Sequence, residues 1–311
     1  MKRGSDVKVG FIGLGVMGLP MAANVVGAGH AVRAFARRDD VRVAARGRGI
    51  QIVDTVADAV NGADVVITVL TDGPAVLEVA LGTDGVLAAI DSAAVYVDMS
   101  TISPNEWAEV AAAFTDRGVD AIDAPVSGGE QGAIEGALSI MAGGDAAALE
   151  RVASVLASMG TVTHVGGAGA GQVVKAANQL VVAGTIQLVA EALVVLERGG
   201  VDLGKALDVL GRGLAGSTVI QRKRDALLSR DYRPGFRLEL HAKDLGIVAD
   251  AARSGKLSLP LTAAVTQLVN ASVAGGKGAL DHSALYELAL EANGLVGDPA
   301  AGEVAMSGRR S

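Results

Sequence analysis

The segment Gly166-Gly-Ala-Gly-Ala-Gly-Gln-Val-Val-Lys-Ala-Ala-Asn178 decides how this 311-residue chain is organised, and an apolar run continues from it to Leu196. Beyond Gly171 only one glycine and no proline interrupt the run, so the pattern predicts one long helix that ends near Arg198. Its apolar residues cover most of the helical circumference, which is typical of a buried helix. Strand-like sequence precedes this segment and helix-like sequence follows it, which predicts a domain boundary near Gly166.

Two polar residues, Lys175 and Asn178, lie near the start of this helix and, being three residues apart, on one face of it. Burial lowers the pKa of an ammonium group, and a lysine with a lowered pKa can exchange a proton with a substrate. A solvated lysine in the first turn of the helix explains the same residues equally well. This segment alone leaves both interpretations open.

A glycine motif near the N-terminus stands between two strand-like runs. Val7 to Ile12 predicts a buried strand, Gly13-Leu14-Gly15-Val16-Met17-Gly18 follows at once, and a helical pattern then leads to a second strand from Ala31 to Phe35. Strand, G-x-G-x-x-G, helix and strand in this order form a dinucleotide-binding unit. Gly13 permits the tight turn, Gly15 lets the backbone approach a pyrophosphate, and Gly18 lets helix and strand pack closely. We therefore predict that Gly13 to Gly18 bind the cofactor, with the helix N-terminus facing its phosphates.

The end of the second strand bears on the choice between NAD and NADP. An acidic residue there commonly holds the ribose 2′-hydroxyl of NAD, but this chain has Phe35-Ala36-Arg37-Arg38. Two guanidinium groups, Arg37 and Arg38, suit a 2′-phosphate, because a planar guanidinium binds phosphate with paired donors. The sequence thus favours NADP. If Arg37 only stacks on the adenine, NAD remains usable.

The alternation of strands and helices continues to about residue 165. Five further runs predict strands: Asp64–Leu70, Val95–Asp98, Val119–Asp123, Ser139–Ala142 and Thr161–Val165. Ligands of open parallel sheets lie beyond the carboxyl ends of the strands, so Leu70, Thr71 and Thr101 are candidate cofactor contacts. The turn Ser127-Gly128-Gly129 could offer several backbone N–H groups to a substrate carboxylate, although an ordinary glycine turn has the same composition.

From Gly169 to Asn293 every periodic segment is helical. The predicted fold is therefore α/β, with a dinucleotide-binding domain over residues 1–166, an all-helical domain over 167–296 and a disordered tail over 297–311. Lys243 lies within one of these helices, where an ordinary ion pair is the simplest interpretation. The four histidines show no metal-ligand spacing, so we predict no metal site.

Composition excludes several classes of protein. The net charge of −7 argues against a general nucleic-acid surface, and the absence of cysteine excludes disulfides and thiol catalysis. The N-terminus lacks the uninterrupted apolar core of a signal peptide. The apolar run from Leu180 to Leu196 carries Gln187 and Glu191 and is shorter than the ~20 residues that span a bilayer. We expect a cytoplasmic protein that does not insert into membranes.

Four blocks, in this order, make the chain resemble the β-hydroxyacid dehydrogenases, also called the 3-hydroxyisobutyrate dehydrogenase family. They are Gly10–Gly18, Asp123–Gly129, Gly169–Asn178 and Lys243–Leu245. The resemblance covers nearly the whole chain. It implies a Rossmann domain joined by a long interdomain helix to an all-helical domain, and an assembly of two or four copies of the chain.

The resemblance also implies roles for individual residues. Lys175 would be the general acid/base, Asn178 would orient the substrate, and Ser127 to Gly129 would hold its carboxylate. Lys243 would lie near both the nicotinamide and the substrate. Three further segments resemble the branch of the family that reduces tartronate semialdehyde (2-hydroxy-3-oxopropionate): Gly213–Val219, Asp231–Phe236 and Asp281–Ala284.

Three other functions stay open at this stage. Within the family, the chain could act on 3-hydroxyisobutyrate, threonate or another β-hydroxy acid. Imine reductases have a similar architecture but generally lack the lysine equivalent to Lys175, which counts against that activity. A non-catalytic dinucleotide-binding protein is the third possibility, because a fold does not imply a function.

Overall fold

The structure is a computed structural model that describes residues 7–295. Contacts divide the chain after Asn178, which gives a first unit up to that residue and a second unit from Gln179 onward. The division falls inside the long helix, beyond the boundary after Gly166 that the sequence predicts. The predicted tail, residues 297–311, lies outside the described residues.

The first unit is built on one mixed sheet. Six parallel strands lie side by side in the order β3 (Gln51–Val53), β2 (Ala31–Phe35), β1 (Lys8–Ile12), β4 (Val65–Thr68), β5 (Val95–Asp98) and β6 (Asp120–Asp123). Three more strands extend it: β8 (Leu138–Gly143) is antiparallel to β6 and to β7 (Val126–Ser127), and β9 (Gly160–Gly166) is parallel to β8. The order 3-2-1-4-5-6 is that of the Rossmann fold, and the strand order reverses between β1 and β4.

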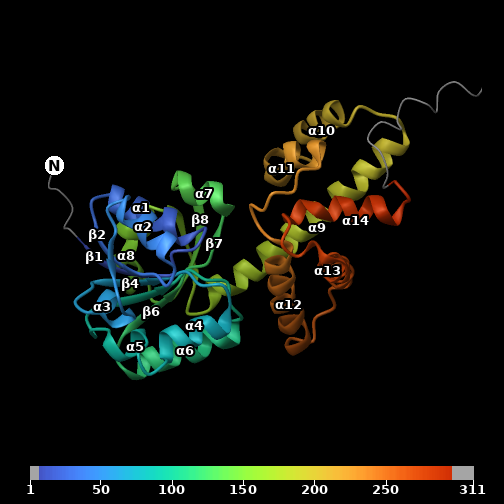
Figure 1. The fold of residues 1–311 in the computed structure, drawn as a ribbon. Coiled ribbons are helices and arrows are strands. Elements are labelled where there is room, and N and C mark those ends of the chain that lie inside the picture. Colours follow the sequence, from blue (N-terminus) through green and yellow to red (C-terminus); the bar gives the residue numbers. More distant parts are fainter. Residues whose placement is uncertain (1–6, 296–311) are drawn as a thin grey trace, which may run out of the picture. The chain divides into compact units, whose positions relative to one another are not determined.

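Helices cover both faces of this sheet (Figure 1). One apolar cluster contains residues of α1 (Gly18–Gly27), α2 (Asp39–Arg46), α7 (Gly129–Glu135) and α8 (Ala146–Ala157). The other contains residues of α3 (Val56–Val60), α4 (Gly73–Leu81), α5 (Val86–Ala89) and α6 (Pro104–Asp116). Successive strand residues point to opposite faces, so Val65 and Ile67 join the first cluster and Val66 the second. Strands buried on both faces explain the continuous apolar runs in the sequence.

Local signals placed several of these elements correctly. The Ser103–Glu106 capping box opens α6, with Pro104 at its first position. Seven elements were not predicted from the sequence, and each is at most nine residues long: α2, α3, α4, α5, α7, β3 and β7.

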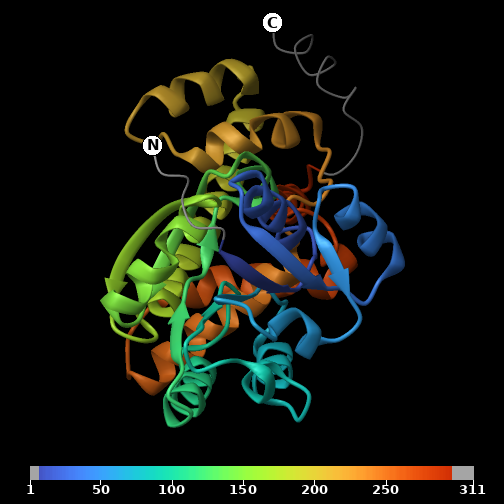
Figure 2. The same ribbon diagram turned by 90° about the vertical axis from the view of Figure 1, so that its left-hand side faces the viewer.

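The long helix α9 runs from Ala170 to Arg198 and is continuous. The second unit contains its later turns, the helices α10 (Leu203–Arg212), α11 (Thr218–Ser229), α12 (Leu238–Ser254), α13 (Pro260–Ser272) and α14 (Leu285–Ala292), and short helical turns at Val273–Lys277 and His282–Ala284. Within this unit α10 and α11 lie side by side in both views (Figures 1 and 2). The prediction that every periodic segment from Gly169 to Asn293 is helical agrees with these elements.

By length and composition alone, α9 could cross a membrane, and it is the one such helix among residues 7–295. It is longer than the apolar run that the sequence analysis considered. The core helix of a soluble protein passes the same test, and 44% of the most apolar window of α9 is buried. Gln179, which is buried on this helix, donates to buried Asp244 of α12 at 2.6 Å, which is the behaviour of a helix packed in a protein core. The cytoplasmic location stays a prediction.

A buried polar network holds the second unit together around Asp281. Its carboxylate accepts hydrogen bonds from Lys223 Nζ (2.8 Å) and from the backbone N–H groups of Gly235 and Phe236 (2.9 and 3.0 Å). It also accepts from the backbone and the hydroxyl of Ser283. The Asp281 side chain thus joins α11, the loop before α12 and the start of the last helical segment.

Candidate cofactor and substrate site

The glycine motif after β1 has the geometry that a pyrophosphate site needs. Gly13 has φ 101°, and a Cβ atom there would overlap the Val69 carbonyl oxygen. A Cβ atom at Gly18 would overlap the carbonyl oxygen of Gly13. The chain itself therefore requires glycine at these two positions. A Cβ atom at exposed Gly15 would meet no atom within 4 Å, so the fold itself does not require glycine there. A glycine at this position instead leaves space for a ligand close to the backbone.

The loops after β4 and β5 lie at the same edge of the sheet as this motif. Leu70 donates its backbone N–H to Ser100 Oγ (2.8 Å), and the exposed Thr71 donates its hydroxyl to Asp72 (3.0 Å). Thr101 follows Ser100 directly and is half-buried. The first unit thus brings the candidate cofactor contacts from three adjacent strands, β1, β4 and β5, to one edge.

The arginine pair after β2 is exposed. Arg38 precedes α2, and its Nε lies 3.6 Å from Asp40 Oδ1; both side chains are solvated. Sequence reasoning missed Arg42, whose guanidinium donates to the Ala36 carbonyl oxygen (3.2 Å) and to Asp54 (2.5 Å). Arg42 therefore fixes the turn that carries Arg37 and Arg38.

Lys175 is buried, with 6% of its surface exposed, and its Nζ donates to the Val126 carbonyl oxygen at 2.7 Å. Ser127 is the next residue and ends β7, and Gly128 and Gly129 follow with φ values of 141° and 64°. The solvated interpretation of Lys175 is therefore wrong. Asn178 lies three residues further along α9 and is half-buried.

Lys243 lies on α12 in the second unit, and its Nζ is 3.1 Å from Asp244 Oδ1. The other oxygen of Asp244 accepts from Gln179 Nε2 at 2.6 Å. The ion pair expected of an ordinary helical lysine is thus present. It involves a carboxylate that is buried and that also ties α12 to α9.

Two buried carboxylates at strand ends were not recognised from the sequence. Asp98 ends β5 and accepts from the hydroxyl groups of Thr68 and Ser100 (2.7 and 2.6 Å). Asp123 ends β6 and accepts backbone N–H groups of α9 and the loop before it. Burial raises the pKa of each to about 6, and the hydrogen bonds oppose that shift. The signal for both was an acid at the last position of an apolar strand, which we took only as a strand end.

Two family models match the chain. The NAD-binding domain of 6-phosphogluconate dehydrogenase matches residues 8–167, and the NAD-binding domain of NADP-dependent 3-hydroxyisobutyrate dehydrogenase matches residues 169–289. The 2-hydroxy-3-oxopropionate reductase of Escherichia coli (strain K12) is 40% identical over 289 residues, which cover 92% of this chain and 99% of the relative. The chain belongs to the 3-hydroxyisobutyrate dehydrogenase-like family.

Solved structures agree with the fold. The Mycobacterium tuberculosis 3-hydroxyisobutyrate dehydrogenase with L-serine is 36% identical and superposes with a TM-score of 0.82, covering 91% of this chain and 98% of that one. Psf3 in complex with NADP+ and 2-OPP is 25% identical, with a TM-score of 0.83 and coverage of 90% and 99%.

Membership in the 3-hydroxyisobutyrate dehydrogenase-like family makes this chain an NAD(P)-dependent oxidoreductase, specifically a β-hydroxyacid dehydrogenase that acts on small hydroxy acids. The predicted architecture, a Rossmann domain followed by a helical domain, is confirmed. The glycine motif fits the cofactor, because the open space at Gly15 lets the protein backbone come close to the pyrophosphate of a dinucleotide.

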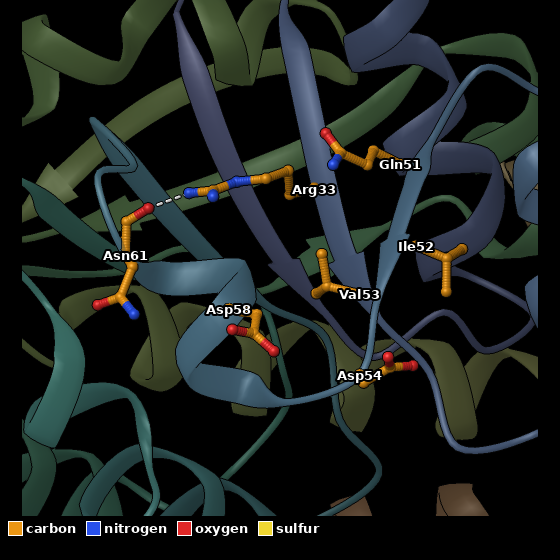
Figure 3. A pocket seen from close by; sticks show the side chains of 7 residues that line it. All are labelled: Arg33, Gln51, Ile52, Val53, Asp54, Asp58 and Asn61. Atoms are coloured by element: carbon orange, nitrogen blue, oxygen red, sulfur yellow. Dashed lines mark hydrogen bonds between the residues drawn. The ribbon is translucent and has the colours of Figure 1, made fainter.

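The hollow drawn in Figure 3 lies elsewhere in this dehydrogenase, on β2, β3 and α3. Its charged lining comes from Arg33, Asp54 and Asp58, and Arg33 donates to the Asn61 carbonyl oxygen. None of the predicted site residues lines it. Within residues 7–295, no group of three His, Asp or Glu side chains is arranged to hold a metal ion.

Proposed function

We propose that this dehydrogenase reduces 2-hydroxy-3-oxopropionate, with Lys175 as the general acid. The single observation that carries the role of Lys175 is its position: a buried amine whose Nζ lies 2.7 Å from the Val126 carbonyl oxygen, next to the Ser127–Gly129 turn. The substrate assignment is supported by 40% identity to the E. coli reductase over 92% of the chain.

In this proposal some residues of the chain bind and orient the substrate, and Lys175 transfers the proton. Ser127, Gly128 and Gly129 bind the substrate carboxylate: both glycines have positive φ values, and a glycine turn of this kind can present backbone N–H groups to an anion. Asn178 and Lys243 orient the substrate. The nicotinamide, when bound, supplies hydride to the carbonyl carbon.

Lys175 gives its proton to the carbonyl oxygen as that oxygen gains the electron pair of the broken π bond, so the aldehyde becomes a primary alcohol. In the oxidative direction the neutral amine takes the hydroxyl proton back. The hydrogen bond to the Val126 carbonyl oxygen holds the buried amine in one place, so the same group is positioned for proton transfer in either direction.

We propose that NADP is the preferred cofactor, bound through the fingerprint Gly13–Gly18 and near Leu70, Thr71 and Thr101. Arg37 and Arg38 are exposed at the turn after β2, where a 2′-phosphate is recognised in this fold. The hydrogen bond from Arg42 to the Ala36 carbonyl oxygen holds that turn in place.

We also propose that the chain assembles as a homodimer or homotetramer. Val181, Leu188 and Val195 repeat at intervals of seven on α9 and are each about two-thirds exposed. A row of apolar side chains at that spacing is typical of a helix that packs on another helix.

Replacing Lys175 with alanine tests the catalytic role. The rate constant kcat should fall by roughly 10²–10⁴-fold while cofactor affinity stays nearly unchanged, because the proton donor is lost and the glycine motif is untouched. Steady-state kinetics with cofactor titration measure both. Lys205→Ala, at an exposed lysine of α10, is the matched control and should leave kcat unchanged. If Lys175→Ala keeps kcat within a few-fold of the wild type, Lys175 is not the general acid.

A substrate panel tests the specificity. The highest kcat/KM is expected for 2-hydroxy-3-oxopropionate with NADPH, measured against 3-hydroxyisobutyrate, threonate and L-serine with NADP and NAD. A higher kcat/KM for any of these β-hydroxy acids would replace the proposed substrate within the same family. Preference for NAD would show that the arginine pair does not select a 2′-phosphate.

A further inference from the structure

The start of α9 is held by a carboxylate from a distant strand. Asp123 Oδ1 accepts the backbone N–H of Gly169 at 2.8 Å, and its Oδ2 accepts that of Gln172 at 2.9 Å. The first N–H groups of a helix have no partner within the helix, and a side chain usually supplies one locally. Here the cap comes from the end of β6, 46 residues earlier in the chain. The cap therefore fixes the helix to the sheet.

The side chain of Gln172 makes a second attachment from the same turn. It is buried, its Oε1 accepts the backbone N–H of Ile102 at 3.2 Å, and its Nε2 donates to the Ser100 carbonyl oxygen at 2.9 Å. Both ends of the amide are used, and they clamp the loop that carries Thr101. The first turn of α9 is thus tied to the ends of β5 and β6 together.

Close packing leaves this turn little freedom to move. A Cβ atom at Gly171 would overlap the Met141 carbonyl oxygen and lie 2.7 Å from Asp123 Oδ2. A Cβ atom at Gly143 would lie 2.5 Å from Asp123 Oδ1. The helix start, the carboxylate and β8 are therefore in direct contact, and a shift of one requires a shift of the others.

We infer that Asp123 and Gln172 are positioning residues for Lys175. Lys175 lies three residues after Gln172, on the same face of the helix, and its Nζ meets the Val126 carbonyl oxygen three residues beyond Asp123. The two side chains fix where the helix starts, and so where the amine lies beside the Ser127–Gly129 turn. This inference rests on the proposed role of Lys175 as the general acid.

Asp123→Asn tests the positioning role with little change in size. One oxygen can still accept an N–H group, but the amide nitrogen would face the other N–H group and repel it. The helix start should shift, and kcat should fall by roughly 10–100-fold, because small displacements of a reacting group have effects of this size. The KM for substrate and the Kd for NADPH should change by less than about threefold, because Gly13–Gly18 and Ser127–Gly129 are untouched.

Asp145→Asn is the matched control. Asp145 also caps a helix, α8, by accepting the N–H groups of Ala147 and Ala148 at 2.9 and 3.0 Å, but that helix carries none of the site residues. Because Asp145 Oδ1 alone accepts both N–H groups, an asparagine can keep this cap, and Asp145→Asn should change stability little. Only Asp123→Asn should lower kcat. Equal kcat values for Asp123→Asn and the wild type would overturn the inference.

A double-mutant cycle separates positioning from general damage to the fold. If Asp123 acts through Lys175, Asp123→Asn should reduce the residual rate of Lys175→Ala by less than about twofold. If the two effects multiply, the positioning role is wrong although Lys175 remains the general acid. If Lys175→Ala is itself active, the proposed function fails, and the inference fails with it.

Gln172→Met provides an independent variant, should Asp123→Asn not fold. It removes both clamping hydrogen bonds and keeps a side chain of similar length. We expect a fall in kcat that again disappears in the Lys175→Ala background. The Kd for NADPH should also rise, because the Thr101 loop loses its clamp. An unchanged kcat would contradict the positioning role of Gln172.

Discussion

Both units of the chain bury carboxyl groups, but the surroundings favour the protonated form in the first unit and the ionised form in the second. In the first unit Asp98 and Asp123 are held by hydroxyl and backbone N–H groups, and burial raises their pKa to about 6. In the second unit burial also acts on Asp281, but the Lys223 ammonium and the hydrogen bond from the Ser283 hydroxyl outweigh it and hold its pKa well below the ordinary value. The charge of the donor, rather than burial alone, decides which form a buried carboxylate takes.

The difference predicts opposite responses to acid. A carboxylate with a raised pKa binds its proton more tightly in the folded state, so it favours folding as pH falls from about 6 to 4. In the second unit, burial and the neighbouring His241 and Lys223 lower the pKa of His282 well below its ordinary value. That imidazole is neutral when folded and gains a proton on unfolding, so its contribution to stability is lost as pH falls below about 6.5. Mild acid should therefore stabilise the first unit and weaken the second.

The largest expected effect is the removal of the anion in the second unit. Asp281→Ala leaves the Lys223 ammonium, which is mostly buried, and three backbone N–H groups without their acceptor, and should cost about 3–5 kcal/mol of unfolding free energy. Urea unfolding at pH 7 measures the loss. Asp231→Ala, which breaks the more exposed pair with Arg233, is the control and should cost less than about 1 kcal/mol. Similar losses in both variants would show that the Asp281 network is no stronger than a surface pair.

The next effect depends on pH and concerns Asp98. An asparagine at this position can still accept from Thr68 and Ser100, and it replaces an oxygen, Asp98 Oδ2, that has no hydrogen-bond partner. Between pH 4 and 7 the wild type should lose roughly 2 kcal/mol of stability relative to Asp98→Asn, because only the wild type must ionise a buried carboxyl group whose pKa is about 6.

Unfolding free energies of the two proteins at pH 4, 5, 6 and 7 give this difference directly. Asp145→Asn, at an exposed helix cap, should show no such change with pH. Curves for Asp98→Asn and the wild type that run parallel across this range would mean that Asp98 titrates near its ordinary value.

The sequence predicted the architecture of the first unit because its signals are local. Short apolar runs and the G-x-G-x-x-G spacing need only neighbours along the chain, and they placed β1, α1 and β2 to within about a residue. The buried state of Lys175 was left open, because it depends on Val126, 49 residues away. The attachments through Asp123 and Gln172 were missed for the same reason: each joins residues at least 46 positions apart.

The polar network of the second unit could not be predicted from patterns in the sequence. His241 and His282 are 41 residues apart, yet their Nδ1 atoms lie 3.1 Å from one another, and His241 Nε2 meets the Gln179 carbonyl oxygen. Lone histidines in a helical sequence are typical both of structural and of solvated positions, and the sequence does not distinguish the two. Only tertiary packing shows that these two are buried, and apolar periodicity carries no information about which polar side chains will meet.

The smallest expected effects compare two glycines on one helix, one in each unit. Alanine is favoured over glycine inside a helix by up to about 1 kcal/mol, so Gly184→Ala should stabilise the protein by about 0.5–1 kcal/mol, since its Cβ would meet no atom within 4 Å. Gly171→Ala should destabilise it by about 1–3 kcal/mol in spite of the same propensity, because its Cβ would overlap the Met141 carbonyl oxygen. Thermal unfolding of the two variants and the wild type shows whether each substitution raises or lowers the stability. If both substitutions stabilise, the start of α9 is not packed against β8 as tightly as its contacts indicate; if Gly184→Ala destabilises, another surface, such as a second copy of the chain, packs against Gly184.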